Sequence, residues 1–195
     1  MAKKLESTFL NMFLTLLIVT AISSLAAGLA YQLTKEPIAE VARQKQQKAI
    51  EQVLPGFTDI RQFSVMPETG SDSLIFYEGT KDGEVVGVAV NTYTQLGYSG
   101  LIKIIVGFKP DGTLVSYEVL EHKETPGLGG KASDASFKDQ FKNQNLNTFR
   151  LKVTKDGGDV DAITAATITS RAVCDAIQRA YDAYEKVKNQ PTENK

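Results

Sequence analysis

A hydroxyl-rich segment at residues 161–170 carries the residue types best suited to chemistry in this chain. It reads Asp-Ala-Ile-Thr-Ala-Ala-Thr-Ile-Thr-Ser and holds a single charged residue. Apolar residues follow it at steps of three and four, which is the period of one helix face; they are Val173, Ile177, Ala180, Tyr184 and Val187. Thr169 and Ser170 therefore lie at the expected amino terminus of a helix over residues 170–188, where backbone N–H groups lack intrahelical partners.

Two interpretations of these hydroxyl groups are open on local physics. In the simpler one, a hydroxyl caps the helix by accepting a hydrogen bond from a free backbone N–H. In the other, a phosphate is bound or attached there, because the free N–H groups and the positive end of the helix dipole favour an anion.

The second informative segment is glycine-rich and covers residues 122–131. It reads His-Lys-Glu-Thr-Pro-Gly-Leu-Gly-Gly-Lys. A P-loop needs Ser or Thr after its Gly-Lys pair, and the dinucleotide fingerprint needs a third glycine, but Ala132 stands at both positions. Pro126 and Gly127 instead predict a tight turn. Residue types alone therefore favour a structural loop.

Together the two segments resemble the FMN-binding domain family found in the G subunit of Rnf electron-transport complexes and the C subunit of sodium-pumping NADH:quinone reductase. The flavinylation motif of that family, approximately D-x-x-S/T-G-A-T-x-S/T, is matched by Asp161, Thr164, Ala166, Thr167 and Thr169. Its H-x-E-T-P-G-L-G signature is matched by His122, Glu124, Thr125, Pro126, Gly127, Leu128 and Gly129. The modest chain length favours the Rnf G subunit.

The resemblance implies that a flavin transferase joins FMN to Thr169 through a phosphoester, giving phosphothreonyl-FMN. The other expected cofactor-binding residues are Asp161, Thr164, Ala166, Thr167, Glu124, Thr125, Gly127, Leu128 and Gly129. Glycine lets backbone approach a flat ring closely, and Leu128 offers the ring an apolar surface. Glu124 and Thr125 can hydrogen-bond to polar edges of the flavin or to its ribityl chain.

The resemblance also implies a function. The chain is expected to be a redox subunit of an ion-translocating ferredoxin:NAD oxidoreductase, to work with other membrane and redox subunits, and to have no complete activity alone. The cofactor would carry the redox chemistry while the protein supplies attachment and orientation. A C-type subunit of the quinone reductase is the nearest alternative.

A membrane-tethered binding or assembly module without flavin is an alternative of another class. Ala165 supports it, because the family motif has glycine at that position. If the backbone there requires a positive φ, alanine is strained by about 1 kcal/mol.

The amino-terminal stretch over residues 7–34 holds no charged residue. At about 1.5 Å per residue it is long enough to cross a hydrocarbon core of ~30 Å, which predicts a transmembrane helix. A cleaved signal peptide is the alternative, although its apolar region is usually only about 7–15 residues long. Lys3 and Lys4 precede the span, and we expect the amino terminus in the cytoplasm. The soluble domain would then lie on the outer, periplasmic side of a bacterial inner membrane.

Composition argues against nucleic-acid binding, disulfides and metal sites. The chain has 195 residues and a net charge of −1, so it has no basic excess and nucleic-acid binding is not expected. Cys174 is the only cysteine and His122 the only histidine, which makes an intramolecular disulfide impossible and a metal site improbable. We expect Cys174 to be a small packed residue. His122 is either a flavin contact or a partly exposed residue at a strand end.

The pattern of elements predicts an α+β fold with an antiparallel sheet. The expected parts are a transmembrane anchor (1–34), a helical stalk (35–56), an FMN-binding domain (57–189) and a polar tail (190–195). Pro37 begins a new helix or kinks the first one. Strands are expected at 74–78, 84–90, 101–108, 113–120 and 151–153, with a short helix at 133–141 capped by Ser133.

Overall fold

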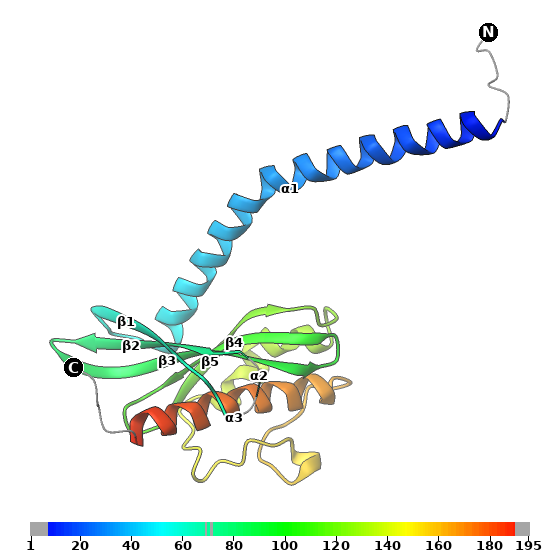
Figure 1. The fold of residues 1–195 in the computed structure, drawn as a ribbon. Helices are drawn as coiled ribbons and strands as arrows, with labels where there is room; N and C mark the ends of the chain where they lie inside the picture. Colours follow the sequence, from blue (N-terminus) through cyan, green and yellow to red (C-terminus); the bar gives the residue numbers. More distant parts are fainter. Residues whose placement is uncertain (1–7, 69, 71, 190–195) are drawn as a thin grey trace. The chain divides into compact units, whose positions relative to one another are not determined.

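The computed structural model describes residues 8–68, 70 and 72–189 and is drawn in Figure 1. It divides into two compact units, residues 1–44 and residues 45–195. The expected polar tail lies outside the described residues, as do the two lysines on which the expected membrane orientation depends.

The first unit is helical. Helix α1 covers Phe9–Val53 and continues through Pro37, so the separate helix considered from the sequence does not form. Proline removes one hydrogen bond of the helix ladder, and here the flanking turns preserve the helix on both sides. Among the described residues, α1 is the one helix long and apolar enough to cross a membrane, and its large apolar side chains from Phe9 to Leu33 are exposed.

The second unit is built on a five-stranded antiparallel sheet in which every strand pairs with the next along the chain. The strands are β1 Asp59–Val65, β2 Leu74–Lys81, β3 Glu84–Gly97, β4 Gly100–Phe108 and β5 Leu114–His122. This confirms the predicted fold class. The predicted hairpin between β2 and β3 is also confirmed: Asp82 and Gly83 both have positive φ, at 53° and 84°, as a two-residue turn between twisted strands requires.

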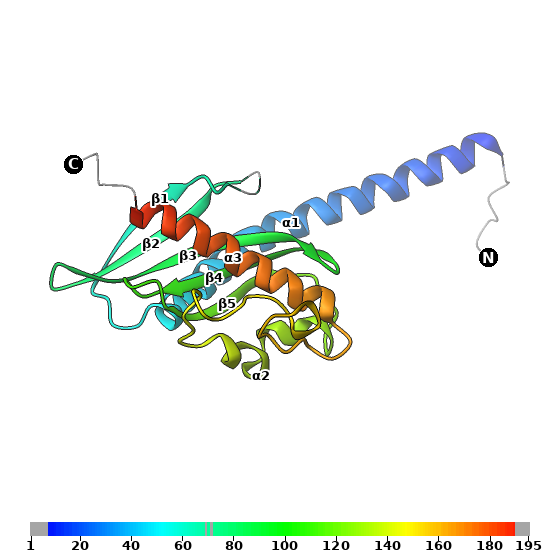
Figure 2. The same ribbon diagram turned by 90° about the horizontal axis from the view of Figure 1, so that it is seen from below.

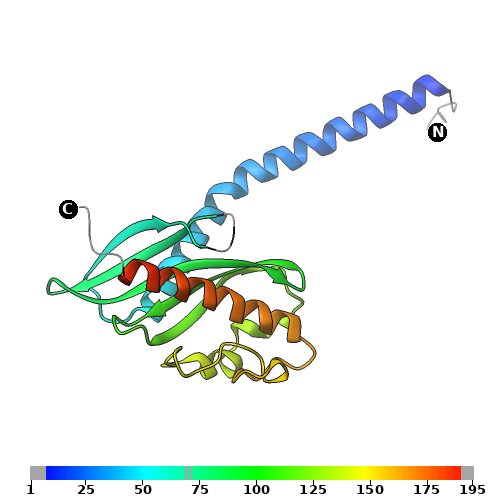
Figure 3. The same ribbon diagram turned by 60° about the horizontal axis from the view of Figure 1, so that its bottom comes forward.

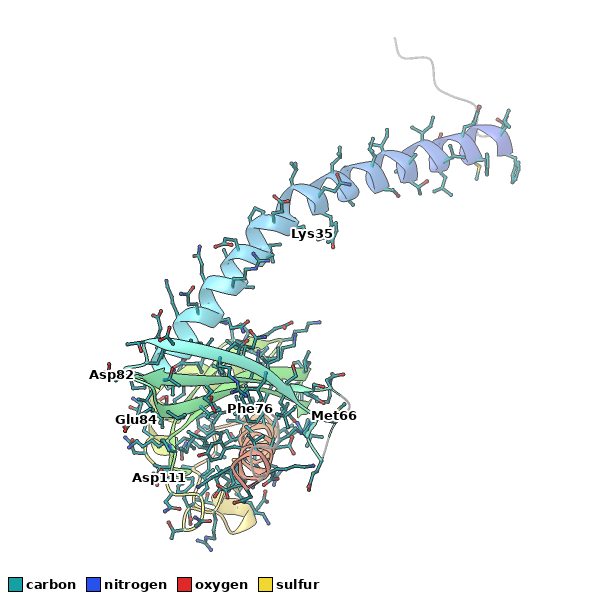
Figure 4. All side chains as sticks on the ribbon, turned by 60° about the vertical axis from the view of Figure 1, so that its left-hand side comes forward. Lys35, Met66, Phe76, Asp82, Glu84 and Asp111 are labelled. Carbon is teal, nitrogen blue, oxygen red and sulfur yellow. The ribbon has the colours of Figure 1, made fainter. Side chains whose placement is uncertain are left out.

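One face of the sheet packs against helix α3, Thr167–Asn189, which runs along the strands in Figure 2. Phe76, Val90 and Ile104 point from three neighbouring strands into the core beneath this helix. Figure 4 labels Phe76 in this interior, whereas the turn residue Asp82 lies at the surface.

The opposite face of the sheet packs against the last turns of α1. Ala89 and Ile105 belong to a second core with Ala49, Ile50 and Val53, because alternate residues of a strand point to opposite faces. Residues 45–53, expected to form part of the stalk, are therefore part of the compact domain.

Strand β1 was not predicted. It is an edge strand whose side chains are mostly exposed, so its sequence lacks a buried apolar alternation. The strand is held by tertiary contacts: it pairs with β2, and Phe63 stacks on Phe76 with ring centroids 5.3 Å apart.

The prediction of one continuous helix over residues 133–141 is wrong, because the segment is broken into short helical pieces. The segment folds as a 3-10 helix Gly129–Ser133, the one-turn helix α2 Ala135–Lys138 and a second 3-10 helix Asp139–Phe141. Asp134 interrupts it with extended backbone (φ −79°, ψ 145°), and Ser133 ends the first piece rather than capping α2. Tertiary contacts explain the shape: Phe137 and Phe141 reach into the core, and Tyr117 donates to the carbonyl of Ala132 at 2.7 Å.

The predicted strand over residues 151–153 is also wrong. Val153 makes an isolated bridge to Val160, and a 3-10 helix, Thr154–Asp156, separates the two. The bridge is parallel, and the few residues between its two partners are too short for the crossover that a parallel strand pair needs. Figure 3 shows the segments between β5 and α3 gathered beside the amino-terminal end of α3.

Candidate functional site

A pocket of about 480 Å³ lies where the glycine-rich loop meets the start of α3. The loop after β5, the turn before α3 and the first turn of α3 supply most of its walls, and the turn between β3 and β4 supplies Tyr98. The lining residues are Tyr98, Glu124, Thr125, Leu128, Gly129, Ala165, Ala166, Thr167, Ile168 and Thr169. The fold therefore joins the two segments that the sequence analysis singled out separately.

A buried hydrogen bond connects these segments. The hydroxyl of Thr169 donates to Oε2 of Glu124 at 2.6 Å, and Thr169 is 1% exposed and Glu124 5%. The backbone N–H of Ser99 donates to the other carboxylate oxygen at 2.8 Å. Each oxygen of this carboxylate thus has one donor, which is how a buried carboxylate is normally accommodated.

Two glycines make room for the carboxylate. A Cβ on Gly129 would lie 2.4 Å from Oε2 of Glu124 and 2.6 Å from the hydroxyl of Thr169. A Cβ on Gly97 would lie 2.9 Å from the other carboxylate oxygen. Any larger residue at Gly129 would therefore have to displace the two hydrogen-bonded side chains.

The glycine-rich loop begins with the predicted tight turn. The N–H groups of Leu128 and Gly130 both donate to the carbonyl of Thr125, and Gly127 has a φ of 78°. Proline at the second position and a positive φ at the third define a type II turn. At the start of the loop, Nδ1 of His122 accepts from the N–H of Glu124 at 3.1 Å. His122 is half-buried and ends β5, as one of its two interpretations predicted.

The hydroxyl-rich segment forms a second turn directly before α3. The N–H of Ala166 donates to the carbonyl of Ile163 at 2.9 Å, and Ala165 has a φ of 61°. The backbone conformation that favours glycine is thus present, and alanine occupies it. Helix α3 begins at Thr167, three residues earlier than predicted, so Thr169 lies within the first turn and not at the cap position.

The mouth of the pocket is apolar and its inner end is polar. Tyr98, Leu128 and Ile168 stand at the mouth, with 72%, 43% and 48% of their surfaces exposed. The inner end holds the hydroxyl of Thr169 and the first turn of α3, whose free N–H groups and dipole favour a phosphate. This arrangement suits a ligand that has a flat apolar ring at one end and a phosphate at the other.

Seven of the ten residues predicted to bind the cofactor line this pocket, namely Glu124, Thr125, Leu128, Gly129, Ala166, Thr167 and Thr169. Gly127 lies in the turn beside it. Asp161 and Thr164 line a separate hollow of about 360 Å³ that also includes Lys131. Tyr98 and Ile168 also line the pocket and were not expected there from the sequence; the signal that could have found each is a large apolar residue directly beside a glycine or a threonine.

Cys174 lies on α3 and its side chain is buried in the core, which confirms the predicted packing role. Burial raises the pKa of its thiol to about 12. Within the described part of the chain, no group of three or more His, Cys, Asp or Glu side chains could hold a metal ion.

Known proteins are similar to this chain in sequence and in fold. A family model described as FMN-binding domain matches residues 97–182. The G subunit of an ion-translocating oxidoreductase complex from Methanosarcina acetivorans is 32% identical over 176 residues, covering 88% of this chain and 92% of that protein. The corresponding protein from Vibrio atlanticus is 37% identical over 181 residues, covering 86% of each chain.

Two further proteins are similar. The G subunit of the Na⁺-translocating ferredoxin:NAD⁺ oxidoreductase complex of Acetobacterium woodii is 31% identical over 191 residues, covering 89% of this chain and 90% of that protein. The crystal structure of the C subunit of Na⁺-translocating NADH-quinone reductase from Parabacteroides distasonis aligns with a TM-score of 0.59 and 18% identity, covering 78% of this chain and 96% of the other. This similarity shows that the two proteins share a fold.

The fold, the pocket and the matched family model define an FMN-binding domain preceded by a long apolar helix. The chain belongs to the family of G subunits of ion-translocating oxidoreductase complexes. The resemblance inferred from the two motifs is confirmed.

Proposed function

We propose that this chain is the electron-carrying G subunit of an ion-translocating ferredoxin:NAD oxidoreductase complex, with FMN attached covalently to Thr169 through a phosphoester. The observation that carries the proposal is the position of the Thr169 hydroxyl. It lies in the first turn of α3, lines the pocket and is hydrogen-bonded to the carboxylate of Glu124. The relative from Acetobacterium woodii supports the choice of complex.

The residues of the pocket fit such a group. The first turn of α3 would hold the phosphate by its free N–H groups. Thr125 and Thr167 line the walls, where their hydroxyls can hydrogen-bond to a ribityl chain. Leu128, Ile168 and Tyr98 would flank the flat ring at the mouth. When bound, FMN supplies a centre that accepts and releases electrons; the protein orients it and leaves the ring near the surface, where a neighbouring protein of the complex can approach.

Helix α1 supports a role as the membrane anchor, because it is long and apolar enough to cross a membrane and its large apolar side chains from Phe9 to Leu33 are exposed. We place the amino terminus in the cytoplasm and the domain on the outer face of the membrane. A covalent tether suits that location, since a dissociated cofactor would be lost from the complex. Maturation then requires a flavin transferase as a partner.

The test is co-expression of the full chain with a flavin transferase, followed by flavin fluorescence on a denaturing gel and intact-mass measurement. The wild-type chain and Thr169→Ser should carry one FMN phosphoester, and Thr169→Val should carry none. Thr167→Val serves as the neighbouring-hydroxyl control and should keep its flavin. A fluorescent Thr169→Val band would disprove the attachment residue.

The same experiment separates the proposal from a flavin-free assembly module. If the wild-type chain stays dark while the transferase modifies another substrate, covalent attachment is disproved, and a native chain that also holds no bound FMN would favour the flavin-free module. Deleting the gene should abolish ferredoxin:NAD oxidoreduction in membranes. If NADH:quinone activity were lost instead, the chain would act in the quinone reductase.

A further inference from the structure

The contact between Thr169 and Glu124 permits a chemical role for Glu124 that is separate from hydrogen bonding to the flavin. In the structure Glu124 faces the hydroxyl that is to be modified, at 2.6 Å from oxygen to oxygen. That distance is within the reach of a general base for the proton it removes. A threonine hydroxyl is a weak nucleophile until an adjacent base takes its proton.

We propose that Glu124 is the general base for the attachment of flavin to Thr169, so that the acceptor protein supplies part of the catalysis of its own modification. This inference rests on the proposed covalent attachment. It assigns to the chain a catalytic residue for the modification, while the transferase supplies and positions the flavin donor.

The step balances as a phosphoryl transfer. A flavin dinucleotide is the donor, because forming a phosphoester requires an activated phosphate and its pyrophosphate provides one. Oγ1 of Thr169 forms a bond to the flavin-side phosphorus, the pyrophosphate P–O bond breaks, and AMP leaves. The proton of Thr169 passes to Oε2 of Glu124 and is later released to solvent. No electron is gained or lost.

Three features of the site prepare Glu124 for this role. The N–H of Ser99 holds one carboxylate oxygen at 2.8 Å, which leaves the other oxygen directed at Thr169. Gly129 lacks the Cβ that would occupy the space between the two side chains. The carboxylate and the hydroxyl are both buried, and in a site with little water a hydrogen bond is electrostatically stronger.

Proton transfer also removes a charge conflict while the phosphoester forms. The phosphoester carries a negative charge next to the position of Glu124, and two adjacent anions in a buried site repel each other strongly. A Glu124 that has taken the proton is neutral at the moment the new anion forms. The same contact therefore favours the transfer step itself.

The test is a kinetic comparison of purified full-length chains with purified flavin transferase and flavin dinucleotide, followed by intact mass. Glu124→Gln retains an amide oxygen that can accept the hydrogen bond from the N–H of Ser99, but its side chain cannot act as a base for the Thr169 proton. We expect its kcat for attachment to fall by about 10²–10⁴-fold, the usual contribution of a general base, with KM nearly unchanged. Glu124→Asp keeps the carboxylate and should recover part of the rate.

Glu121→Gln is the matched control. Glu121 lies on β5, just before the loop that holds Glu124, is about half exposed and pairs with Lys103 on the surface, so this variant should react at the wild-type rate. Circular dichroism and thermal unfolding of all variants establish that they fold. If a folded Glu124→Gln attached flavin within twofold of the wild-type rate, the base role would be overturned while the proposed function stood. A wild-type chain that took no flavin would overturn the proposed function itself.

Discussion

The hydroxyl of Ser170 joins the end of the hydroxyl-rich turn to the first turn of α3. It accepts a hydrogen bond from the N–H of Ile163 at 3.0 Å and donates one to the carbonyl of Ala166 at 3.0 Å. Ser170 is fully buried, and Ile163 and Ala166 are nearly so. This side chain therefore fixes the turn that presents Thr169 to the pocket.

Replacing Ser170 with alanine should destabilise the domain by about 1–3 kcal/mol, because the buried N–H of Ile163 loses its hydrogen-bond partner. The midpoint of thermal unfolding should fall by about 2–4 °C for each kcal/mol in a domain of this size. Ser133→Ala, at an exposed position, is the control and should change stability by less than about 0.5 kcal/mol. Equal midpoints for the two variants would mean that the Ser170 hydrogen bonds contribute little.

Replacing Ala165 with glycine should stabilise the protein. Its φ of 61° strains an alanine by about 1–2 kcal/mol, and the greater freedom of glycine in the unfolded chain offsets about 0.4–1 kcal/mol of the relief. The net gain of up to about 1.6 kcal/mol should appear as a higher midpoint in thermal or chemical unfolding. Ala162→Gly, in the same segment but outside the positive-φ residues, should lower the midpoint. If both variants were destabilised, strain at Ala165 would be ruled out as a significant term.

The thiol of Cys174 should be unreactive in the folded protein. Burial raises its pKa to about 12, and since only the thiolate is nucleophilic, very little of the reactive form exists at pH 8. A disulfide reagent such as DTNB should modify it slowly in buffer and rapidly after unfolding in guanidinium. Rapid stoichiometric modification of the native chain would contradict the buried placement.

The ion pair between Arg171 and Asp156 should make a pH-dependent contribution to the stability of the folded protein. The guanidinium donates to both carboxylate oxygens, at 2.7 and 2.8 Å, and this hydrogen bonding lowers the pKa of Asp156. A carboxyl with a lower pKa in the folded state stabilises the protein above its unfolded pKa and loses that effect as the pH falls through the folded value. The stability deficit of Arg171→Gln at pH 7 should therefore shrink below pH 4, the range of an ordinary aspartate.

Asp156→Asn provides the check on that prediction. In this background Arg171→Gln should cause little further change at pH 7, because the partner of the guanidinium is already neutral. A deficit of Arg171→Gln that stayed constant down to pH 3 would show that the arginine acts through packing and not through the ion pair.

The sequence by itself determined the features that depend on neighbouring residues. The uncharged stretch over residues 7–34 predicted a long apolar helix because its length and composition are sufficient. Asp82 with Gly83, and Pro126 with Gly127, predicted turns that formed because these residues favour the required backbone angles. The apolar period after Thr169 predicted α3, since one helix face alone must be buried.

Only the tertiary structure decided the contacts between distant parts of the chain. Glu124 and Thr169 are 45 residues apart, and neither local propensity nor periodicity specifies that a loop after β5 meets the first turn of α3. Strand β1 depends on a partner strand for its conformation, and the segment over residues 133–141 is shaped by the core into which its two phenylalanines pack. Long-range packing of this kind overrides local preference, which is why the sequence indicated the chemistry of Thr169 while the fold supplied its partner.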